Sequence, residues 1–435
     1  MPARGEKGLP AVRILYVTPA FPPFVGGGER YARDLAIGLS RRGIEIAVVT
    51  SNAVTESDLW TGASDAIADP CGHGEARLRV RRLTCQGLGL GRAGLLARRK
   101  AMVLLSGLPG DQSRALRRQA LSFPRLSGLS EALDSMNVPD LVHAFNLSWE
   151  GPMVAAHAWA RRHNVPFVVT PFLHVGHRRG RRVLRNHTMD HQLFLLRDAD
   201  AVLALTSIER DALVGLGVRP DRVHVVGAGI DLPSRQESGK LSRTHPSDRE
   251  APAEILFLGR VCREKGAFDA ARAVGRLVDE GASVRLVLAG AISRPFMRFW
   301  CSLRDAHRAA ILLLGVVDER TKAALLSRAT ALVLPSAVES FGLVVLEAWA
   351  YGKPVIVARA GALPAVVTDG ENGLLVEYGD PVGLAAAIER LLGNDGLASC
   401  LGAAGREKLL RMYRWDHVVE RVEHAYADAL QRAAK

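Results

Sequence analysis

Short apolar segments alternate with longer amphipathic segments along most of the chain. Residues 12–18 (VRILYVT) and 44–50 (IEIAVVT) have the length and β-branched content of buried strands, and a helical stretch ending at Arg42 lies between them. The pattern predicts further strands at 76–83, 140–145, 167–170, 201–205 and 223–226, and then at 254–259, 283–290, 309–315, 329–336, 354–358 and 372–376. Strands that alternate with helices are typical of parallel sheets covered by helices on both faces.

Residues 232–253 separate two such series. This stretch is rich in Pro, Ser, Arg, Glu and Lys and poor in apolar residues, as expected of a linker. We therefore predict an α/β protein of two doubly wound, Rossmann-like domains, residues 1–231 and 254–412, followed by an amphipathic helix over 413–435. A length of 435 residues suits two domains.

Two glutamates lie in the strand–loop–helix segment 331–351. The pattern predicts Glu339 in the loop and Glu347 in the second turn of the helix, so that both reach the mouth above the strand ends. The amides of Gly342 and Leu343 would add an anion site at the helix N-terminus. Two hydroxyl acceptors beside a phosphate cradle suit a nucleotide sugar. The alternative is that both glutamates are surface residues of an ordinary amphipathic helix, although the neighbours of Glu347 are all apolar.

Three other groups of residues follow strand ends, where open parallel sheets bind ligands. Arg260 and Lys265 come after the first strand of the second series and could clamp a diphosphate, or could be exposed loop charges. The loop 26–28 (GGG) could bring backbone amides to a ligand, or could be a tight turn with no ligand. His143 and His174 each follow a strand and could be site residues or satisfied loop histidines.

Positive charge is concentrated in the first half of the chain. The formal net charge is +12: residues 1–235 carry 31 Lys and Arg against 21 Asp and Glu, and the remainder carries 26 against 24. Nucleic-acid binding is disfavoured because the basic stretches lack interleaved aromatic residues and any known binding motif. No apolar run reaches the roughly 18 residues of a membrane span and no signal-peptide core precedes the first strand, so we expect a cytoplasmic protein. The five scattered cysteines form no C-x-x-C pair and are expected to be reduced, structural thiols.

The segment 77–125 is strongly basic, with 12 basic residues and one acid. Within it, the helix expected over 92–105 alternates leucine, methionine and valine with the basic run 98–100 (RRK). Such a helix can lie in an anionic membrane surface; the alternative is that it packs its apolar side on the domain and leaves its arginines in water. A second basic run, 178–185, could meet an anionic acceptor or form a solvated loop.

The segment from Glu339 to Glu347 resembles the E-x7-E motif of the group 1, family-4 type retaining glycosyltransferases. Further family-like pieces keep their order, including Arg260 with Lys265 in a G-R…K-G pattern and 369–376 (DGENGLLV). The resemblance spans about residues 13–425; it is close in the second half and slight over 51–139. It implies the GT-B fold, in which two Rossmann-like domains face each other across a cleft and the C-terminal helix crosses back to the N-terminal domain.

The resemblance also implies a role for most of the candidate residues. His174 and Glu339 would contact the transferred sugar, with His174 near the reacting carbon, and Arg260 and Lys265 would both bind the diphosphate and stabilise its departure. The rest of the nucleotide sugar would be held by a further set, in which Glu347 accepts hydrogen bonds from the ribose: Gly27, Gly28, Phe341, Gly342, Leu343 and Glu347. The family often shows H-x-H where this chain has His143-Ala144-Phe145, so the resemblance assigns no role to His143.

We therefore expect a retaining glycosyltransferase that moves a hexose from a UDP- or GDP-sugar to a saccharide or lipid-linked acceptor, in cell-surface polysaccharide or glycolipid biosynthesis. We expect no metal and no other cofactor, because cations and amides would offset the phosphate charge; the Asp-x-Asp spacing at Asp198 and Asp200 is interpreted as helix-end polarity. The basic first half suggests peripheral association with the inner face of an anionic membrane. The alternatives are a nucleotide-sugar epimerase or hydrolase on the same fold, or a non-catalytic, membrane-associated subunit.

Overall fold

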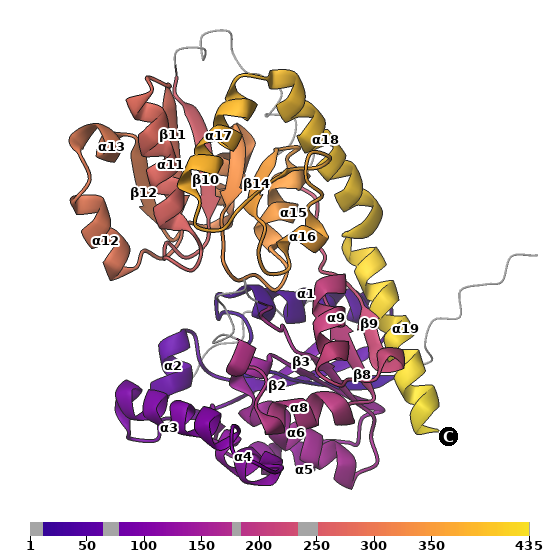
Figure 1. Cartoon of the computed structure of the whole chain (residues 1–435). Coiled ribbons are helices and arrows are strands. Elements are labelled where there is room, and N and C mark those ends of the chain that lie inside the picture. Colours follow the sequence, from indigo (N-terminus) through magenta and orange to yellow (C-terminus); the bar gives the residue numbers. More distant parts are fainter. Residues whose placement is uncertain (1–11, 64–77, 176–183, 234–250, 435) are drawn as a thin grey trace, which may run out of the picture. The chain divides into compact units, whose positions relative to one another are not determined.

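The computed structural model describes residues 12–63, 78–175, 184–233 and 251–434 (Figure 1). These residues form two compact units, each built around a parallel sheet. Of the described residues, the first unit comprises 12–63, 78–173, 184–229 and 415–434, and the second comprises 174–175, 230–233 and 251–414. The first unit is therefore discontinuous in sequence, because its last helix follows the whole of the second unit.

The first unit contains a seven-stranded parallel sheet in the order β3-β2-β1-β6-β7-β8-β9. Its strands are β1 (Arg13–Val17), β2 (Glu45–Ser51), β3 (Leu78–Leu83), β6 (Leu141–Phe145), β7 (Phe167–Thr170), β8 (Ala201–Ala204) and β9 (Val223–Val225), and a separate antiparallel pair is formed by β4 (Cys85–Gln86) and β5 (Arg125–Leu126). Its helices are α1 (Gly27–Arg41), α2 (Glu56–Thr61), α3 (Gly91–Leu105), α4 (Ser113–Ala120), α5 (Leu129–Asp134), α6 (Gly151–Arg162), α8 (Asp190–Asp198), α9 (Ser207–Gly215) and α19 (Trp415–Ala433), with a 3-10 turn η1 (Leu147–Trp149).

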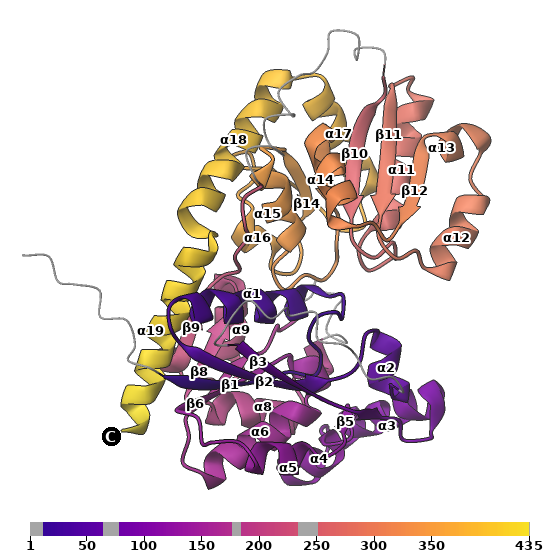
Figure 2. The same cartoon turned by 180° about the vertical axis from the view of Figure 1, so that it is seen from behind.

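Helices cover both faces of this sheet, which explains why its central strands are apolar on both sides. Strands β6, β7 and β8 are buried at every position. Helices α1 and α19 lie on one face and α6 on the other (Figures 1 and 2). Helix α19 presents its apolar stripe to this unit, with Val418, Val422 and Ala425 fully buried.

His143 is a core residue of the first unit, and the expectation that it follows a strand end was wrong. Strand β6 continues to Phe145, so the His143 ring lies within the strand and is fully buried. Its Nδ1 lies 2.7 Å from the Tyr426 hydroxyl and its Nε2 lies 2.8 Å from Thr170 Oγ1. Burial holds the pKa of His143 well below its ordinary value, so the ring is neutral. Because the Tyr426 hydroxyl also lies 3.1 Å from that of Tyr16, α19 is joined to two strands of the sheet by polar contacts.

The second unit contains a six-stranded parallel sheet in the order β12-β11-β10-β13-β14-β15. Its strands are β10 (Ala253–Leu258), β11 (Val284–Ala289), β12 (Ile311–Gly315), β13 (Ala331–Leu334), β14 (Val355–Ala358) and β15 (Leu374–Val376). Its helices are α11 (Ala267–Asp279), α12 (Arg294–Cys301), α13 (Asp305–Ala309), α14 (Glu319–Arg328), α15 (Leu343–Ala350), α16 (Leu363–Val366), α17 (Pro381–Leu392) and α18 (Asp395–Met412).

The two sheets confirm the predicted doubly wound α/β architecture. Every predicted strand is present, with ends that differ by a few residues at most. In the second unit, α11 and α17 pack together over one face of the sheet, while α15 and α18 pack together on the other (Figure 2). Most of the predicted linker lies outside the described residues, and its last residue, Ala253, already belongs to β10.

Helix α3 confirms the predicted helix over 92–105, and it packs on the domain through Leu95 and Met102. The expectation that its arginines would lie in water was wrong for Arg98 and Arg99. Arg98 donates to the Gln119 side chain, with an Nη2–Oε1 distance of 2.6 Å, and its guanidinium lies 5.4 Å from the centre of the Phe123 ring. Arg99 pairs with the fully buried carboxylate of Glu150. Both arginines therefore bind the protein itself. No helix among the described residues combines the length and apolarity needed to cross a bilayer.

Candidate functional site

The second sheet reverses its strand order between β10 and β13, and open α/β sheets bind ligands at such a point. The loops that follow these two strands pack directly on each other. The Ala337 amide donates to the Glu264 carbonyl over 2.9 Å. Gly266 has φ of 78°, and a Cβ at this position would lie only 2.0 Å from the Pro335 carbonyl oxygen. Only glycine therefore allows the two loops to approach so closely. The close packing brings the residues of both loops into one cluster.

Lys265 and Glu339 are the centre of this cluster. The Lys265 Nζ atom lies 2.6 Å from Glu339 Oε1, and the two side chains are 23% and 13% exposed. Glu339 lies in the loop between β13 and α15, as predicted. The structure thus places a cation from one loop and a carboxylate from the other at the same point above the strand ends.

His174 joins the same cluster through Ser340. The Ser340 hydroxyl lies 2.9 Å from His174 Nδ1, and the His174 ring is half-buried. Desolvation, together with the positive charges of Lys265 and Arg260, lowers the pKa of His174 to about 4, against the opposing effect of Glu339. The imidazole is therefore neutral near pH 7 and can accept or donate one hydrogen bond at each nitrogen.

The structure corrects the place assigned to His174. We expected this residue in the N-terminal domain, but it groups with the second unit, one residue after Leu173 of the first. The reason is local: His174 contacts Ser340, and the following Val175 carbonyl approaches Gly361, where a Cβ would lie 3.3 Å from it. The neighbouring basic run 178–185 lies largely outside the described residues.

Glu347 lies in the second turn of α15, as predicted, and its residue exposure of 6% excludes the surface-residue alternative. Its Oε1 atom lies 2.9 Å from the Nζ atom of Lys322 on α14. Lys322 also contacts Glu319 one turn earlier on its own helix. The pairing of Lys322 with Glu347 joins residues 25 positions apart, and no sequence pattern pointed to it.

The N-terminus of α15 lies beside Glu339. Gly342 precedes the helix with φ of 92°, a left-handed conformation that favours glycine. Within the described part of the chain, the amides of Gly342 and Leu343 have no hydrogen-bond acceptor. Phe341 is different from its neighbours, because its ring is buried and packs edge-on against Tyr413, with centroids 5.4 Å apart. The Phe341 side chain is therefore a core group, and only its backbone is available to a ligand.

Gly27 and Gly28 belong to the first unit, at the first turn of α1. A Cβ on Gly28 would lie 2.9 Å from the Phe172 ring, so a glycine is needed there for packing. Burial raises the pKa of the next residue, Glu29, to about 6, although a hydrogen bond to Asn146 opposes this. Because Asn146 follows β6, Glu29 joins the loops at the point where the first sheet reverses its strand order.

Glu209 is a residue whose importance the sequence analysis missed. Its carboxylate is buried on the first turn of α9 and accepts from the amides of Leu173 and Leu205, each over 2.7 Å. Leu173 is the last residue of the first unit before the chain passes to His174, so Glu209 fixes the end of the first unit at this point. The available signal was the spacing Thr206-x-x-Glu209, which is typical of a helix N-terminus. Thr206 does cap α9 by accepting from the Glu209 amide.

Replacing Glu209 by glutamine is expected to change how stability depends on pH. Burial raises the pKa of Glu209 to about 7 against the two backbone hydrogen bonds. The unfolded chain ionises at the ordinary pKa of 4.5, so the stabilisation of the neutral form is complete below pH 4.5 and lost as the pH rises through about 7. The free energy of unfolding of the natural protein should therefore fall by about 3 kcal/mol relative to Glu209→Gln across this window.

Urea unfolding of both proteins from pH 4.5 to 8 measures this difference. Taking the difference removes the similar contribution of Glu29, which both proteins retain. A difference that stays constant across the window would contradict the assignment of the raised pKa to Glu209.

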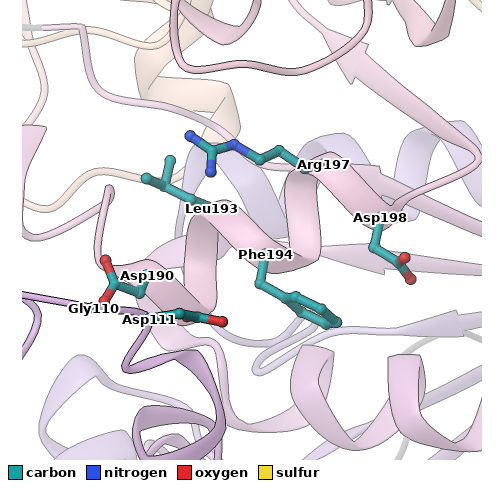
Figure 3. Close-up of a pocket in the computed structure, with 7 residues that line it drawn as sticks. All are labelled: Gly110, Asp111, Asp190, Leu193, Phe194, Arg197 and Asp198. Carbon is teal, nitrogen blue, oxygen red and sulfur yellow. The ribbon is translucent and has the colours of Figure 1, made fainter.

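A pocket of about 410 Å³ lies on the first unit, between α8 and the turn at Gly110 (Figure 3). Leu193, Phe194 and Arg197 line the pocket from α8. Its charged groups already serve the fold: Arg197 donates to the Leu216 carbonyl, and Asp190 accepts from the Gln112 amide. None of the candidate donor-binding residues lines this pocket.

The Asp-x-Asp pair is also structural, in line with its interpretation from the sequence. Asp198 accepts from Arg161 and His157, with atoms 2.9 Å and 2.7 Å apart. Asp200 accepts from Arg161 and from the Phe167 amide. No group of three or more His, Cys, Asp or Glu side chains within the described ranges could hold a metal ion.

Two family matches together cover most of the chain. Residues 252–394 match the glycosyl transferases group 1, and residues 26–229 match the glycosyl transferase 4-like domain. A glycogen synthase of Mycobacterium tuberculosis is 30% identical over 297 residues, which are 67% of this chain and 69% of that protein. A D-inositol 3-phosphate glycosyltransferase of Acidothermus cellulolyticus is 32% identical over 327 residues, which are 69% and 70% of the two chains.

Solved structures share the fold at lower identity. A sucrose-phosphate synthase from Thermosynechococcus elongatus has a TM-score of 0.70 with 21% identity, covering 98% of this chain and all of the other. HepE from Anabaena in complex with UDP and glucose has a TM-score of 0.66 with 18% identity, covering 96% and 99%. Together with the two family matches and the relatives of 30% and 32% identity, the two Rossmann-like units show that this chain belongs to the group 1 glycosyltransferases, with a family-4 type N-terminal domain.

Proposed function

We propose that this glycosyltransferase transfers a hexose from a nucleoside-diphosphate sugar to a saccharide or lipid-linked acceptor with retention of anomeric configuration. The observation that carries the proposal is the cluster at the β10–β13 reversal, where Lys265 touches Glu339 and Ser340 touches His174. A cation and a carboxylate in contact suit a sugar phosphate, because the cation can bind the phosphate and the carboxylate can accept hydrogen bonds from the sugar hydroxyls. HepE from Anabaena, which shares this fold, has been solved in complex with UDP and with UDP-glucose, and this favours a uridine donor within the class.

The roles follow from the charge that develops during transfer. The bond between the anomeric carbon and the donor phosphate breaks, and negative charge grows on the departing diphosphate. Arg260, Lys265 and the amides of Gly342 and Leu343 would offset that charge. A third amide source is the first turn of α1, where the resemblance places Gly27 and Gly28 against the diphosphate.

The two glutamates would hold the two ends of the donor. Glu347, which Lys322 orients, would accept from the ribose hydroxyls. Glu339 would accept from hydroxyls of the transferred sugar. His174 would contact that sugar as a neutral imidazole, because its pKa of about 4 leaves it unprotonated at physiological pH. We assign no covalent nucleophile among these residues, and the acceptor oxygen forms the new bond to the anomeric carbon.

Donor selection can be tested by thermal shift with UDP, GDP and ADP, followed by their glucose and mannose derivatives. We expect a rise in melting temperature with one nucleoside diphosphate, with UDP favoured, since a ligand that binds only the folded state stabilises it. Transfer should continue in EDTA, because the phosphate charge is offset by protein cations and amides. Loss of activity in EDTA that Mg²⁺ or Mn²⁺ restores would contradict the proposal of a metal-independent reaction.

Incubation with the selected donor alone separates the alternatives. An epimerase would convert the donor sugar without any acceptor, and a hydrolase would release free sugar as fast as any transfer. A non-catalytic subunit would bind the nucleoside diphosphate and release none from the donor in the presence of any acceptor. The proposed transferase requires that release of nucleoside diphosphate depends on an added acceptor.

A further inference from the structure

Lys322 lies where helix stability alone would not place a lysine. Helix α14 begins at Glu319, and Asp318 caps it by accepting from the Thr321 amide over 2.7 Å. Lys322 therefore lies at the end of the first turn, close to the helix N-terminus, where the aligned amide groups disfavour a positive charge. Its side chain is only 17% exposed, although lysine side chains normally extend into solvent. Both features indicate that contacts outside the helix backbone determine where this side chain lies.

Two carboxylates hold the Lys322 ammonium group. Its Nζ atom lies 2.8 Å from Glu319 Oε2 and 2.9 Å from Glu347 Oε1. The two acids differ greatly in exposure, because the Glu319 side chain is 80% exposed and the Glu347 side chain is 8% exposed. An ion pair with an exposed carboxylate contributes little to stability, whereas a buried carboxylate needs a cation close to it. Glu347 is therefore the partner that depends on Lys322.

The helix that carries Glu347 has little freedom to move. All residues from 345 to 350 are buried. The Trp349 ring packs so closely on α18 that a Cβ on Gly405 would lie 2.2 Å from it. Because α15 is fixed in this way and Lys322 engages Oε1, the Glu347 carboxylate is held in one orientation before any ligand binds. A group that is already ordered loses less conformational entropy on binding.

An ordered carboxylate of this kind suits two neighbouring hydroxyl groups. An ionised carboxylate only accepts hydrogen bonds, and its two oxygens offer about four lone-pair positions. The 2′ and 3′ hydroxyls of ribose are two donors on adjacent carbons, whereas 2′-deoxyribose has only one of them. A site built to bind a hydroxyl strongly rejects an analogue that lacks it, because a buried polar group is then left unpaired.

We propose that Lys322 fixes Glu347 as the acceptor of both ribose hydroxyls and thereby restricts the donor to ribonucleotide sugars, with their 2′-deoxy counterparts excluded. Lys322 acts through Glu347 and is a positioning residue. The inference rests on the proposed function, in which Glu347 binds the ribose. It adds which nucleotide sugars are excluded and which residue excludes them. The competing role of Lys322 is that of a brace between α14 and α15 with no influence on the nucleotide.

Isothermal titration calorimetry with UDP and 2′-deoxy-UDP tests the proposal, since these ligands differ by one hydroxyl group. The corresponding GDP or ADP pair replaces them if the thermal-shift panel selects another base. We expect the natural protein to bind the ribonucleotide at least about tenfold more tightly, because its 2′ hydroxyl bonds to a charged group. Lys322→Met should lower this preference to about threefold or less, because a carboxylate that is no longer held forms the second hydrogen bond poorly. Lys322→Arg keeps the cation and should restore most of the preference.

Two further variants separate the ribose end of the donor site from the rest of the unit. Lys265→Ala should weaken both nucleotides by the same factor and leave the preference unchanged, because it removes a contact to the phosphate. Arg328→Met is the matched control, since Arg328 ends the same helix and pairs with Glu254 over 2.7 Å. It should bind both nucleotides as the natural protein does. Circular dichroism and melting curves show whether each variant is folded, and Lys322→Gln replaces Lys322→Met if the latter is not.

The outcomes distinguish this inference from the proposed function. Equal binding of UDP and 2′-deoxy-UDP by the natural protein would overturn the inference and leave the proposed transfer in place. A preference for UDP that loss of the Lys322 charge leaves unchanged would show that the ion pair is only a brace between two helices. If no nucleoside diphosphate binds the natural protein, the proposed function fails, and the inference fails with it.

Discussion

Replacing Lys265 by alanine is expected to lower turnover at least about tenfold and to weaken nucleoside-diphosphate binding. The change removes a charged contact worth roughly 1.5–3 kcal/mol, and each 1.36 kcal/mol is about a tenfold change in rate. Glu339→Ala should lower turnover by a similar factor but leave nucleoside-diphosphate binding nearly unchanged, because Glu339 is assigned to the sugar. Turnover is measured as acceptor-dependent release of nucleoside diphosphate, and binding as the thermal shift it produces.

The contrast between these two variants tests the assignment better than either loss alone. The two side chains touch, so general damage to the site would affect them equally. Arg272→Ala is a suitable control, because Arg272 lies on α11 of the same unit and forms an ion pair with Asp269, one turn away on the same helix. Unchanged turnover in folded Lys265→Ala or Glu339→Ala would remove these residues from the mechanism.

Arg99→Ala is expected to destabilise the first unit by about 3–5 kcal/mol, because it leaves the buried carboxylate of Glu150 without its cation. This is a large share of the stability of a typical domain. Hydrogen exchange followed by mass spectrometry can report the first unit separately, through peptides from β6 and α6. Their protection should fall by a factor that corresponds to the lost free energy.

Arg98→Ala provides the control from the adjacent position. Arg98 binds the neutral side chains of Gln119 and Ser122 at a partly exposed site, so its loss should cost only about 1 kcal/mol. If the two variants lose equal protection, the buried charge pair is not what fixes α3.

The alternation of apolar and amphipathic segments was sufficient to predict both sheets, because each strand of a covered parallel sheet is apolar along its whole length. Local signals also placed Glu339 in a loop and Glu347 in a helix, since Pro335 and Gly342 mark the ends of the elements around them. The orientation of α3 could not be predicted in this way. It depends on Glu150, which is 51 residues from Arg99 in the sequence.

The same limit applies to the candidate site. The sequence places Arg260, Lys265 and Glu339 after strand ends, and the strand order then brings Lys265 and Glu339 together. It contains no sign that Lys322 faces Glu347, or that Glu209 holds the backbone before His174, because both contacts join separate elements. The core role of His143 was not predictable for a related reason: its hydrogen-bond partner, Tyr426, is 283 residues away.

Helix α19 completes the first unit, and it is the last element of that unit to be translated. Translation passes from Gly229 through the entire second unit before it reaches Trp415. Until then the sheet lacks the part of its cover that α19 provides over β7, β8 and β9, and the Tyr16 hydroxyl lacks Tyr426. A gene fragment that stops near residue 229 should therefore yield an aggregation-prone product. Fusing residues 415–434 to that fragment through a short linker should restore a soluble, independently expressed half.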